Sequence, residues 1–332
     1  MARNYYIFKA GRISRHDNTV YVETNDGKRA LPVEDIDSLY LFGELDLNTK
    51  VLNFIAQKNV PAHVFNYYGF YAGTFYPREY LNSGFLLVRQ VEHYSDATKR
   101  LEIAREIERA AVHNILKNVA YYETRAQNSS RMTEVREEME RMERGIDGAR
   151  DVSELMGIEG NVRELYYSVW PAILGPDVEF EKRVKRPPDN LVNALISFGN
   201  SMLYATALSE IYRSQLNPTI SYLHQPGERR FSLALDLAEI FKPLIVDRLI
   251  FLLLNTRQIR QEQTRTDVGG CYLDEEARRL FVKNYEEKLQ TTIKHRTLRR
   301  NVSYQHLIRL ECHRLIKHLL GTERYRAFRA WW

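Results

Sequence analysis

The stretch SYLHQPGERRFSLALDLAEIFKP, residues 221–243, places acidic side chains inside an apolar helix pattern. Apolar residues recur from Leu233 to Phe241 at the three- and four-residue spacing of a helix, and Asp236 and Glu239 interrupt them. Side chains three residues apart share one helix face, at about 5–6 Å from each other. Because burying unpaired carboxylates costs several kcal/mol, this pair needs a cation.

Two kinds of cation would meet that need. A divalent metal removes the repulsion between two close carboxylates, and a salt bridge to Arg229, Arg230 or Lys242 is the alternative that the helix alone leaves open. His224 precedes the helix in a Pro-Gly turn, so we expect it to fold back over the helix start. An imidazole with carboxylates suits Mn²⁺, Fe or Zn²⁺ and is tolerable for hydrated Mg²⁺, although a histidine in a turn commonly has only a structural role.

A further acid lies upstream in GIEGNVRELYYSVW, residues 157–170. Glu159 stands between two glycines, and we expect it at a helix start, where backbone and side chain can approach a ligand closely. A carboxylate in that position also stabilises the helix dipole. Helix capping is therefore the alternative role for Glu159.

The composition is that of a soluble globular protein. The chain has 332 residues, of which 44% are hydrophobic and 27% charged, enough for one large or two ordinary domains. Its two cysteines, Cys271 and Cys312, cannot build a disulfide framework, which fits a reduced cytosolic setting. The start MARNYYIFKAGR lacks the apolar region of a signal peptide, and we expect the longest apolar run, PLIVDRLIFLLL, to be a buried helix.

The pattern of apolar residues changes near residue 93. Before it, short runs such as YYIFKA, TVYVET, KRALPV and SLYLFG predict strands, and LNTKVLNFIAQKN predicts one short helix capped by Asn48 or Thr49. After it, the period is helical, with later helices expected at about Leu191–Leu216, Ser232–Asn255, Asp274–Thr292 and Val302–Trp332. The expected fold class is α+β, with a β domain over residues 1–90 and a larger all-α domain over residues 91–332.

Positive charge gathers at the end of the chain. The net charge is only +5, but residues 291–332 hold ten Lys and Arg against two acids. A local excess of this kind on a helical tail attracts polyanions such as nucleic acid. The alternative is a solvated helix face.

Four ordered blocks resemble the CRISPR-associated adaptation endonuclease/integrase ("Cas-one") family: GIEG followed by tyrosines, RPPDNLVNALISFGNSMLY, NPTISYLHQPG and FSLALDLAEIFKP. The LPV and LFG pieces of the N-terminal part are similar to that family too, so the match covers nearly the whole chain. The resemblance implies a β-sandwich-like N-terminal domain, a helical catalytic domain that binds DNA, and a homodimer formed through the β domains.

The same resemblance implies a catalytic metal site. Its ligands fall on Glu159, His224 and Glu239, and Asp236 matches a second acid of the family site. Many relatives have Asp at the last ligand position, where this chain has Glu239. The division of roles between Asp236 and Glu239 therefore stays open.

Basic side chains that flank these residues are candidates for holding DNA phosphates, a contact that does not read sequence. They are Arg163, Arg183, Lys185, Arg186, Arg229 and Arg230, to which the resemblance adds Tyr204 and Lys242 as positions near bound DNA. The aromatic residues Tyr166, Tyr167 and Trp170 follow Glu159 and could stack on bases. Core packing is the expected role for at least two of them.

The reaction implied by the resemblance is metal-dependent phosphoryl transfer with Mg²⁺ or Mn²⁺. It inserts short foreign DNA (spacers) into the CRISPR array, and with water as nucleophile it cleaves DNA. The implied partners are double-stranded and branched DNA and a small companion protein ("Cas-two"). We expect no membrane association and a cytoplasmic location. Two alternatives remain: a non-catalytic DNA-binding scaffold of the same fold, and a metal hydrolase with a small substrate, against which the basic tail counts.

Overall fold

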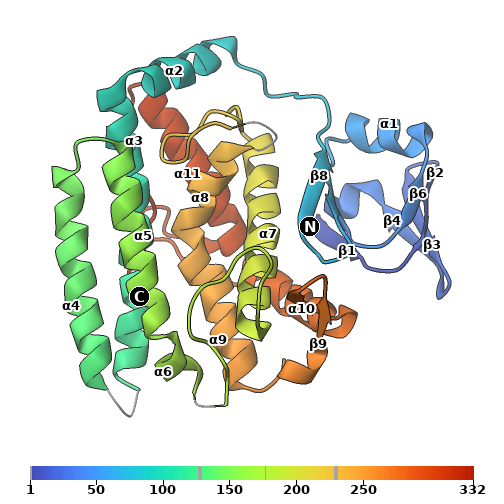
Figure 1. The fold of residues 1–332 in the computed structure, drawn as a ribbon. Helices are drawn as coiled ribbons and strands as arrows, with labels where there is room; N and C mark the ends of the chain where they lie inside the picture. The colour runs from blue at the N-terminus through green and yellow to red at the C-terminus, as the bar shows by residue number, and fades with distance from the viewer. Residues whose placement is uncertain (1, 126–128, 176, 228–230) are drawn as a thin grey trace. The chain divides into compact units, whose positions relative to one another are not determined.

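A computed structural model describes residues 2–125, 129–175, 177–227 and 231–332. The chain divides into two compact units, one made of residues 1–82 and 274–286 and the other of residues 83–273 and 287–332 (Figure 1). The sequence led us to expect a boundary after residue 90 and a second domain without interruption. The observed division differs in both respects, because the first unit ends before α2 (Gly84–Ser95) and takes in part of α10 (Glu275–Gln290).

The first unit contains two four-stranded sheets. One has the order β1-β5-β7-β8, formed by β1 (Arg3–Ile7), β5 (Ile36–Leu41), β7 (Ala62–Phe65) and β8 (Tyr71–Phe75). The other has the order β4-β3-β2-β6, formed by β2 (Gly11–His16), β3 (Thr19–Thr24), β4 (Gly27–Pro32) and β6 (Leu45–Leu47). One hydrophobic cluster draws on both sheets and on α1 (Thr49–Gln57), as in a sandwich. Asn48 caps α1 as predicted, since its side chain accepts a hydrogen bond from the N–H of Val51.

The first part of α10 belongs to this unit because of specific polar contacts. Asn4 and Tyr6 on β1 donate hydrogen bonds to the carboxylate of Glu286, at 3.1 and 2.6 Å. Arg278 donates to the backbone oxygen of Tyr67 at 2.9 Å. Helical periodicity predicts that such a helix exists but not which surface it packs against.

The second unit is mainly helical, which confirms the α+β class. Its helices are α2, α3 (Ala97–Glu123), α4 (Ser129–Gly145), α5 (Val152–Ser168), α6 (Trp170–Leu174), α7 (Leu191–Tyr212), α8 (Ser232–Lys242), α9 (Arg248–Asn255) and α11 (Tyr304–Leu319), with the end of α10. It also holds two short hairpins, β9 (Thr264–Asp267) with β10 (Gly270–Leu273) and β11 (Thr292–Lys294) with β12 (Asn301–Ser303), so it is not purely helical as expected.

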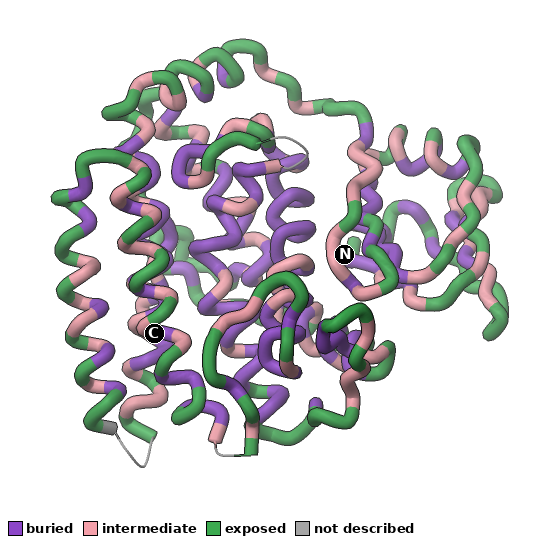
Figure 2. The backbone as a smooth tube through the Cα atoms, in the orientation of Figure 1, coloured by how far each residue is buried: buried purple, intermediate pink, exposed green. Residues whose placement is uncertain are grey.

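Buried helices form the centre of the second unit. Figure 2 shows α7 and α8 mostly buried, whereas α4 exposes one side. By length and composition α7 could cross a membrane, but 83% of its most apolar window is buried inside the protein, as in the core helix of a globular unit. Helix α8 packs against α3 and α7, and α3 packs against α4 and α5. Helices α5 and α8 therefore both pack against α3.

Two predicted helices differ from the sequence pattern: one is interrupted, and the other ends early. The expected helix over Ser232–Asn255 is α8, a π-helical segment Pro243–Asp247, and α9. Pro243 lacks a backbone N–H, which interrupts the regular hydrogen bonding there. The expected helix to Trp332 stops at Leu319, because Gly321 has φ +73 and ends the helix in the left-handed conformation. The apolar run after Pro243 is buried, as predicted.

Candidate active site

Glu159 lies inside α5 and not at its start. The helix begins at Val152, where Asp151 accepts a hydrogen bond from the N–H of Glu154 at 2.9 Å. Glu159 is roughly two turns further on, beyond the first turn in which a carboxylate interacts with the helix dipole. The expectation of a helix-start position is therefore wrong, and a capping role is excluded. The side chain is 22% exposed.

Asp236 holds the segment before α8 against that helix. Its Oδ2 accepts hydrogen bonds from the N–H groups of Tyr222 and Leu223, at 2.7 and 3.0 Å. Its Oδ1 accepts from the N–H of His224 at 2.9 Å and lies 2.8 Å from Nδ1 of the same residue. The carboxylate is fully buried, and both of its oxygens already have two partners. The prediction that His224 folds back over the helix start is confirmed.

The contact with Asp236 fixes the orientation of the His224 ring. A carboxylate oxygen beside Nδ1 places the proton of the neutral imidazole on that atom and leaves the Nε2 lone pair available. Burial disfavours the charged imidazolium, but the hydrogen bond to Asp236 raises the pKa of His224 above its ordinary value. Nε2 lies 4.0 Å from Oε1 of Glu239.

Glu239, one helical turn after Asp236, is the acid that faces the imidazole. Its carboxylate is nearly buried and forms ion pairs with Lys242 and Arg163. Burial opposes ionisation, but the charges of Lys242 and Arg163 hold its pKa at about 2. The salt bridge to Lys242 that the sequence left open as an alternative is thus present, and Arg163 is a second partner.

Arg163 connects the acids of the two helices. Its Nε donates to Oε1 of Glu159 at 3.2 Å, and its other end pairs with Glu239. Glu159, His224 and Glu239 are therefore neighbours in one polar cluster. Within the described ranges, no three His, Cys, Asp or Glu side chains lie close enough together to hold a metal ion, and the guanidinium between Glu159 and Glu239 accounts for their separation.

Two further buried acids adjoin this cluster, and our sequence reasoning missed both as site residues. Glu108 lies on α3 and Asp247 ends the π-helical segment, and each has one carboxyl oxygen with no hydrogen-bond partner in the described part of the chain. Burial, and then the charge of Glu159, raises the pKa of Glu108 well above its ordinary value. Burial likewise raises the pKa of Asp247 to about 7. Asp247 interrupts an apolar run and was visible in the sequence, whereas Glu108 stands among the many charged residues in the first half of α3.

Several of the predicted DNA contacts already have partners within the protein. The Arg183 guanidinium donates to Oδ1 of Asn193 and to Oγ of Ser197, at 2.9 and 2.8 Å. The Tyr204 hydroxyl accepts a hydrogen bond from the N–H of Phe231 at 2.9 Å.

Among the other candidates, Lys185 and Arg186 are exposed, and no ion pair joins them to an acid in the part of the chain that the structure describes. Arg229 and Arg230 lie outside the described residues.

The aromatic residues after Glu159 belong to the core, as expected for at least two of them. Tyr166 and Trp170 are fully buried, with ring centroids 5.6 Å apart. The Tyr166 hydroxyl accepts a hydrogen bond from Asn118 at 3.0 Å. Neither ring is available for stacking on a base.

Half of the basic tail is neutralised inside the second unit. The ion pairs are Arg309 with Glu210, Arg314 with Glu311, Lys317 with Glu323, Arg324 with Glu102, and Arg329 with Glu106. Four of the remaining cations are exposed on or beside the β11–β12 hairpin, at Lys294, Arg296, Arg299 and Arg300. The positive surface is therefore smaller than the sequence count suggested, and it centres on this hairpin.

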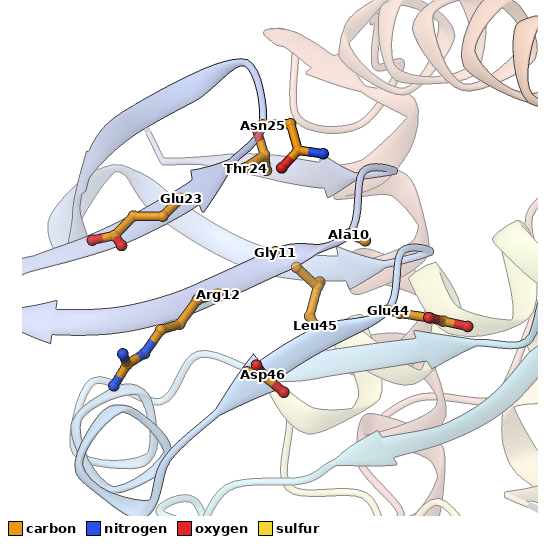
Figure 3. Close-up of a pocket in the computed structure, with 9 residues that line it drawn as sticks. All are labelled: Ala10, Gly11, Arg12, Glu23, Thr24, Asn25, Glu44, Leu45 and Asp46. Carbon is orange, nitrogen blue, oxygen red and sulfur yellow. The ribbon is translucent and has the colours of Figure 1, made fainter.

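A recess on the first unit offers no comparable chemistry. It is lined by residues 10–12, 23–25 and 44–46. Figure 3 shows that its acids, Glu23, Glu44 and Asp46, come from separate segments and do not converge on one point. Glu23 pairs with Lys28 at 2.6 Å. The recess lacks the histidine and the shared partner that unite the cluster on α5 and α8.

The fold and the cluster define a class of protein: a strand-built N-terminal unit with a helical unit that buries histidine and carboxylates in its core. Residues 5–287 match the family model described as CRISPR associated protein Cas1. A protein of Moorella thermoacetica named CRISPR-associated endonuclease Cas1 2 is 53% identical over 332 residues, covering 99% of this chain and 100% of that protein. The chain belongs to the Cas1 family.

Solved structures share the fold. That of TM1797, a Cas1 protein from Thermotoga maritima, has a TM-score of 0.88 at 44% identity and covers 98% of this chain and 99% of its own. Two others are only 18% identical. A casposase bound to integration product has a TM-score of 0.86 and covers 97% of this chain and 91% of its own. A Cas6-RT-Cas1–Cas2 complex has a TM-score of 0.84 and covers 99% of this chain and 36% of its own. At that identity the likeness concerns the fold alone.

Proposed function

We propose that this chain is a divalent-metal-dependent DNA endonuclease/integrase of CRISPR adaptation, as the family and the endonuclease name of its relative indicate. One observation carries the proposal. Nε2 of His224 faces Glu239 at 4.0 Å while Asp236 holds Nδ1, and Arg163 ties Glu159 into the same cluster. An oriented imidazole beside two carboxylates is a ligand set for a metal that acts on phosphates.

The ligands we propose are Glu159, His224 and Glu239. Asp236 is excluded from this set because its oxygens are filled by four hydrogen bonds, so its role is to orient the histidine. The donor types fit Mg²⁺ or Mn²⁺. Among the described residues, one oxygen of Glu108 and one of Asp247 have no hydrogen-bond partner, so the cluster holds unsatisfied acceptors. When bound, such a metal stabilises the charge that develops on the transferred phosphoryl group and activates the nucleophile.

Other residues are proposed to hold the DNA and to position the side chains of the metal site. Exposed Lys185 and Arg186 are the proposed phosphate contacts, and Arg229 and Arg230 remain predictions of the same kind. Four other residues were predicted near DNA: Arg163, Arg183, Tyr204 and Lys242. Each has a hydrogen-bond or ion-pair partner within the chain, and we propose that these residues position the site. We expect a DNA 3′-hydroxyl or water to be the nucleophile, without a covalent enzyme intermediate.

The proposed partners are double-stranded and branched DNA (prespacer and CRISPR repeat), a second copy of the chain through the β unit, and the companion protein Cas2. Two fold relatives, a casposase bound to integration product and a Cas6-RT-Cas1–Cas2 complex, support the DNA and Cas2 partners. Both cysteines are free and buried. This fits the cytoplasmic location that we propose.

Strand joining and cleavage of branched DNA test this function. We expect both activities with Mg²⁺ or Mn²⁺, and loss of both in EDTA while DNA binding persists. His224→Ala removes the activities, and His313→Ala, which changes an exposed histidine of α11, leaves them intact. Activity that resists EDTA would refute the metal, and DNA binding without any chemistry would support the alternative of a non-catalytic scaffold.

A further inference from the structure

The proposed metal site already contains a cation of the protein itself. The Arg163 guanidinium donates to Oε1 of Glu159 at 3.2 Å and forms an ion pair with Glu239. The exposed fraction is 12% for the Arg163 side chain and 5% for that of Glu239, so little water screens this contact. Buried pairs of this kind hold together strongly, because separating them leaves an uncompensated buried charge.

Acidic groups outnumber the cations around this guanidinium. The carboxyl groups whose charge acts on Arg163 are those of Glu108, Glu159, Glu239 and Asp247. Lys242 is the other cation in contact with the cluster, and it pairs with Glu239. One buried oxygen of Glu108 and one of Asp247 also lack a hydrogen-bond partner among the described residues, so the acceptors of the cluster are not all satisfied.

A guanidinium and a divalent metal cannot use the same oxygens together. Mg²⁺ binds carboxylate oxygens at about 2.0–2.1 Å, and the guanidinium already pairs with Oε1 of Glu159 and Oε2 of Glu239. Two cations confined to that gap also repel each other. We propose that the Arg163 guanidinium and the divalent metal are alternative occupants of the gap between Glu159 and Glu239, so that metal binding displaces Arg163.

This exchange gives Arg163 two effects, and the inference rests on the metal site proposed above. In the metal-free protein, Arg163 keeps Glu159 and the buried Glu239 together and stabilises the contact between α5 and α8. For metal binding Arg163 is a competitor. The apparent affinity for the metal equals the intrinsic affinity multiplied by the fraction of molecules in which the gap is open. Removing Arg163 should therefore weaken the metal-free fold and tighten metal binding.

Calorimetric titration of metal-free protein with Mn²⁺ tests the exchange without any activity assay. We expect Arg163→Gln to bind Mn²⁺ about tenfold more tightly than the unaltered chain, which corresponds to about 1.4 kcal/mol. The matched control is Arg136→Gln on α4. Arg136 also lies between two glutamates, Glu123 and Glu140, at 2.8 and 2.6 Å, and this variant should bind Mn²⁺ as the unaltered chain does.

A second variant covers the case in which Arg163→Gln does not fold without metal. Arg163→Lys keeps one charge but lacks the planar fork that reaches two carboxylates, so we expect an affinity severalfold above that of the unaltered chain. If Arg163 instead positioned the acids for the metal, both variants would bind Mn²⁺ more weakly, and equal or weaker binding overturns the exchange alone. Absence of Mn²⁺ binding in every protein would overturn the metal site itself, and the exchange with it.

Discussion

Two arginines in this chain each join a pair of glutamates, and one of the two lies in the proposed metal site. Arg136 bridges Glu123 at the end of α3 and Glu140 on α4, with 27% of its side chain exposed. Arg163 bridges Glu159 and Glu239 with 12% exposed. The residue types and the connection of two helices are the same, but the surroundings differ.

The difference between the two clusters lies in their exposure to water and in the residues around each arginine. An ion pair in contact with water contributes about 0–1 kcal/mol, and its charges are screened. The cluster around Arg163 is shielded, holds an oriented histidine and adjoins two acids that each have one oxygen without a hydrogen-bond partner in the described ranges. A shielded excess of acid binds a divalent cation, whereas the partly exposed cluster on α4 needs none.

The largest difference in activity is expected between variants of Glu239 and Glu140, the glutamates that pair with Arg163 and Arg136 respectively. Glu239→Gln removes the ionised carboxylate that faces His224, and we expect strand joining to fall by roughly a thousandfold, as for the loss of several kcal/mol of transition-state stabilisation. Glu140→Gln should change it less than about twofold, since the pair is at the surface. Single-turnover rates on branched DNA measure both. Comparable losses in the two variants would remove the distinction between the clusters.

A smaller loss should follow from Asp236→Asn. The amide has nearly the shape of the acid but cannot accept four hydrogen bonds, so the His224 ring loses its fixed orientation. We expect activity to fall by about 10–100-fold, the usual range for residues that orient metal ligands. Single-turnover rates of Asp236→Asn and Glu239→Gln on branched DNA, measured together, distinguish an orienting residue from a metal ligand. A loss as large as that of Glu239→Gln would make Asp236 a direct ligand.

The stability of the buried cluster should depend on pH in a way that the exposed cluster does not. Asp247 has its pKa raised from 3.8 to about 7 by burial. Its folded form therefore binds a proton more tightly than the unfolded form, and stability is lost as pH rises towards 7 and above. Asp247→Asn should thus gain stability relative to the unaltered chain between pH 5 and pH 8, by roughly 1 kcal/mol or more.

Urea unfolding at pH 5 and pH 8 measures that difference. Glu140→Gln serves as the control, because an acid at the surface should give the same change at both pH values. A stability difference for Asp247→Asn that is equal at pH 5 and pH 8 would show that Asp247 is ionised at little cost in the folded chain.

The smallest effect concerns Lys185 and Arg186, exposed cations that form no ion pair within the described residues. We expect replacement of Lys185 and Arg186 by Ala to lower DNA affinity and to reduce the slope of log K against log salt by roughly two, as for two lost phosphate contacts. Arg131→Ala removes an exposed arginine of α4 that pairs with Glu134 at 3.1 Å, and it should leave the slope unchanged. Fluorescence anisotropy over a range of salt concentrations measures the slopes. Equal slopes in all three proteins would place the DNA elsewhere.

Local chemistry made parts of this structure predictable from the sequence. Asn48 is the N-cap of α1, His224 folds over α8, and the run after Pro243 is buried, as predicted. Each depends on neighbouring residues alone, through capping preferences, a tight turn or apolar composition. The resemblance to the family added the grouping of Glu159 with His224 and Glu239, which spacing could not supply.

The rest depends on contacts between distant segments. The part that Arg163 plays could not be read from the sequence, because its second partner lies 76 residues away on another helix. Likewise, the tail appeared strongly basic, but its arginines meet acids as far away as Glu102 on α3. The place of α10 in the first unit arises in the same way, because its partners Asn4, Tyr6 and Tyr67 are distant in the sequence.

The central claim is that Glu159, His224 and Glu239 bind one divalent metal, with Asp236 outside the ligand set. Anomalous scattering from crystals grown with Mn²⁺ tests it most directly. The account predicts a single peak in contact with Nε2 of His224 and with both glutamates, with the Arg163 guanidinium moved out of the gap between them. A peak on the Asp236 carboxylate, or Arg163 still bridging Glu159 and Glu239 beside a bound ion, would contradict it.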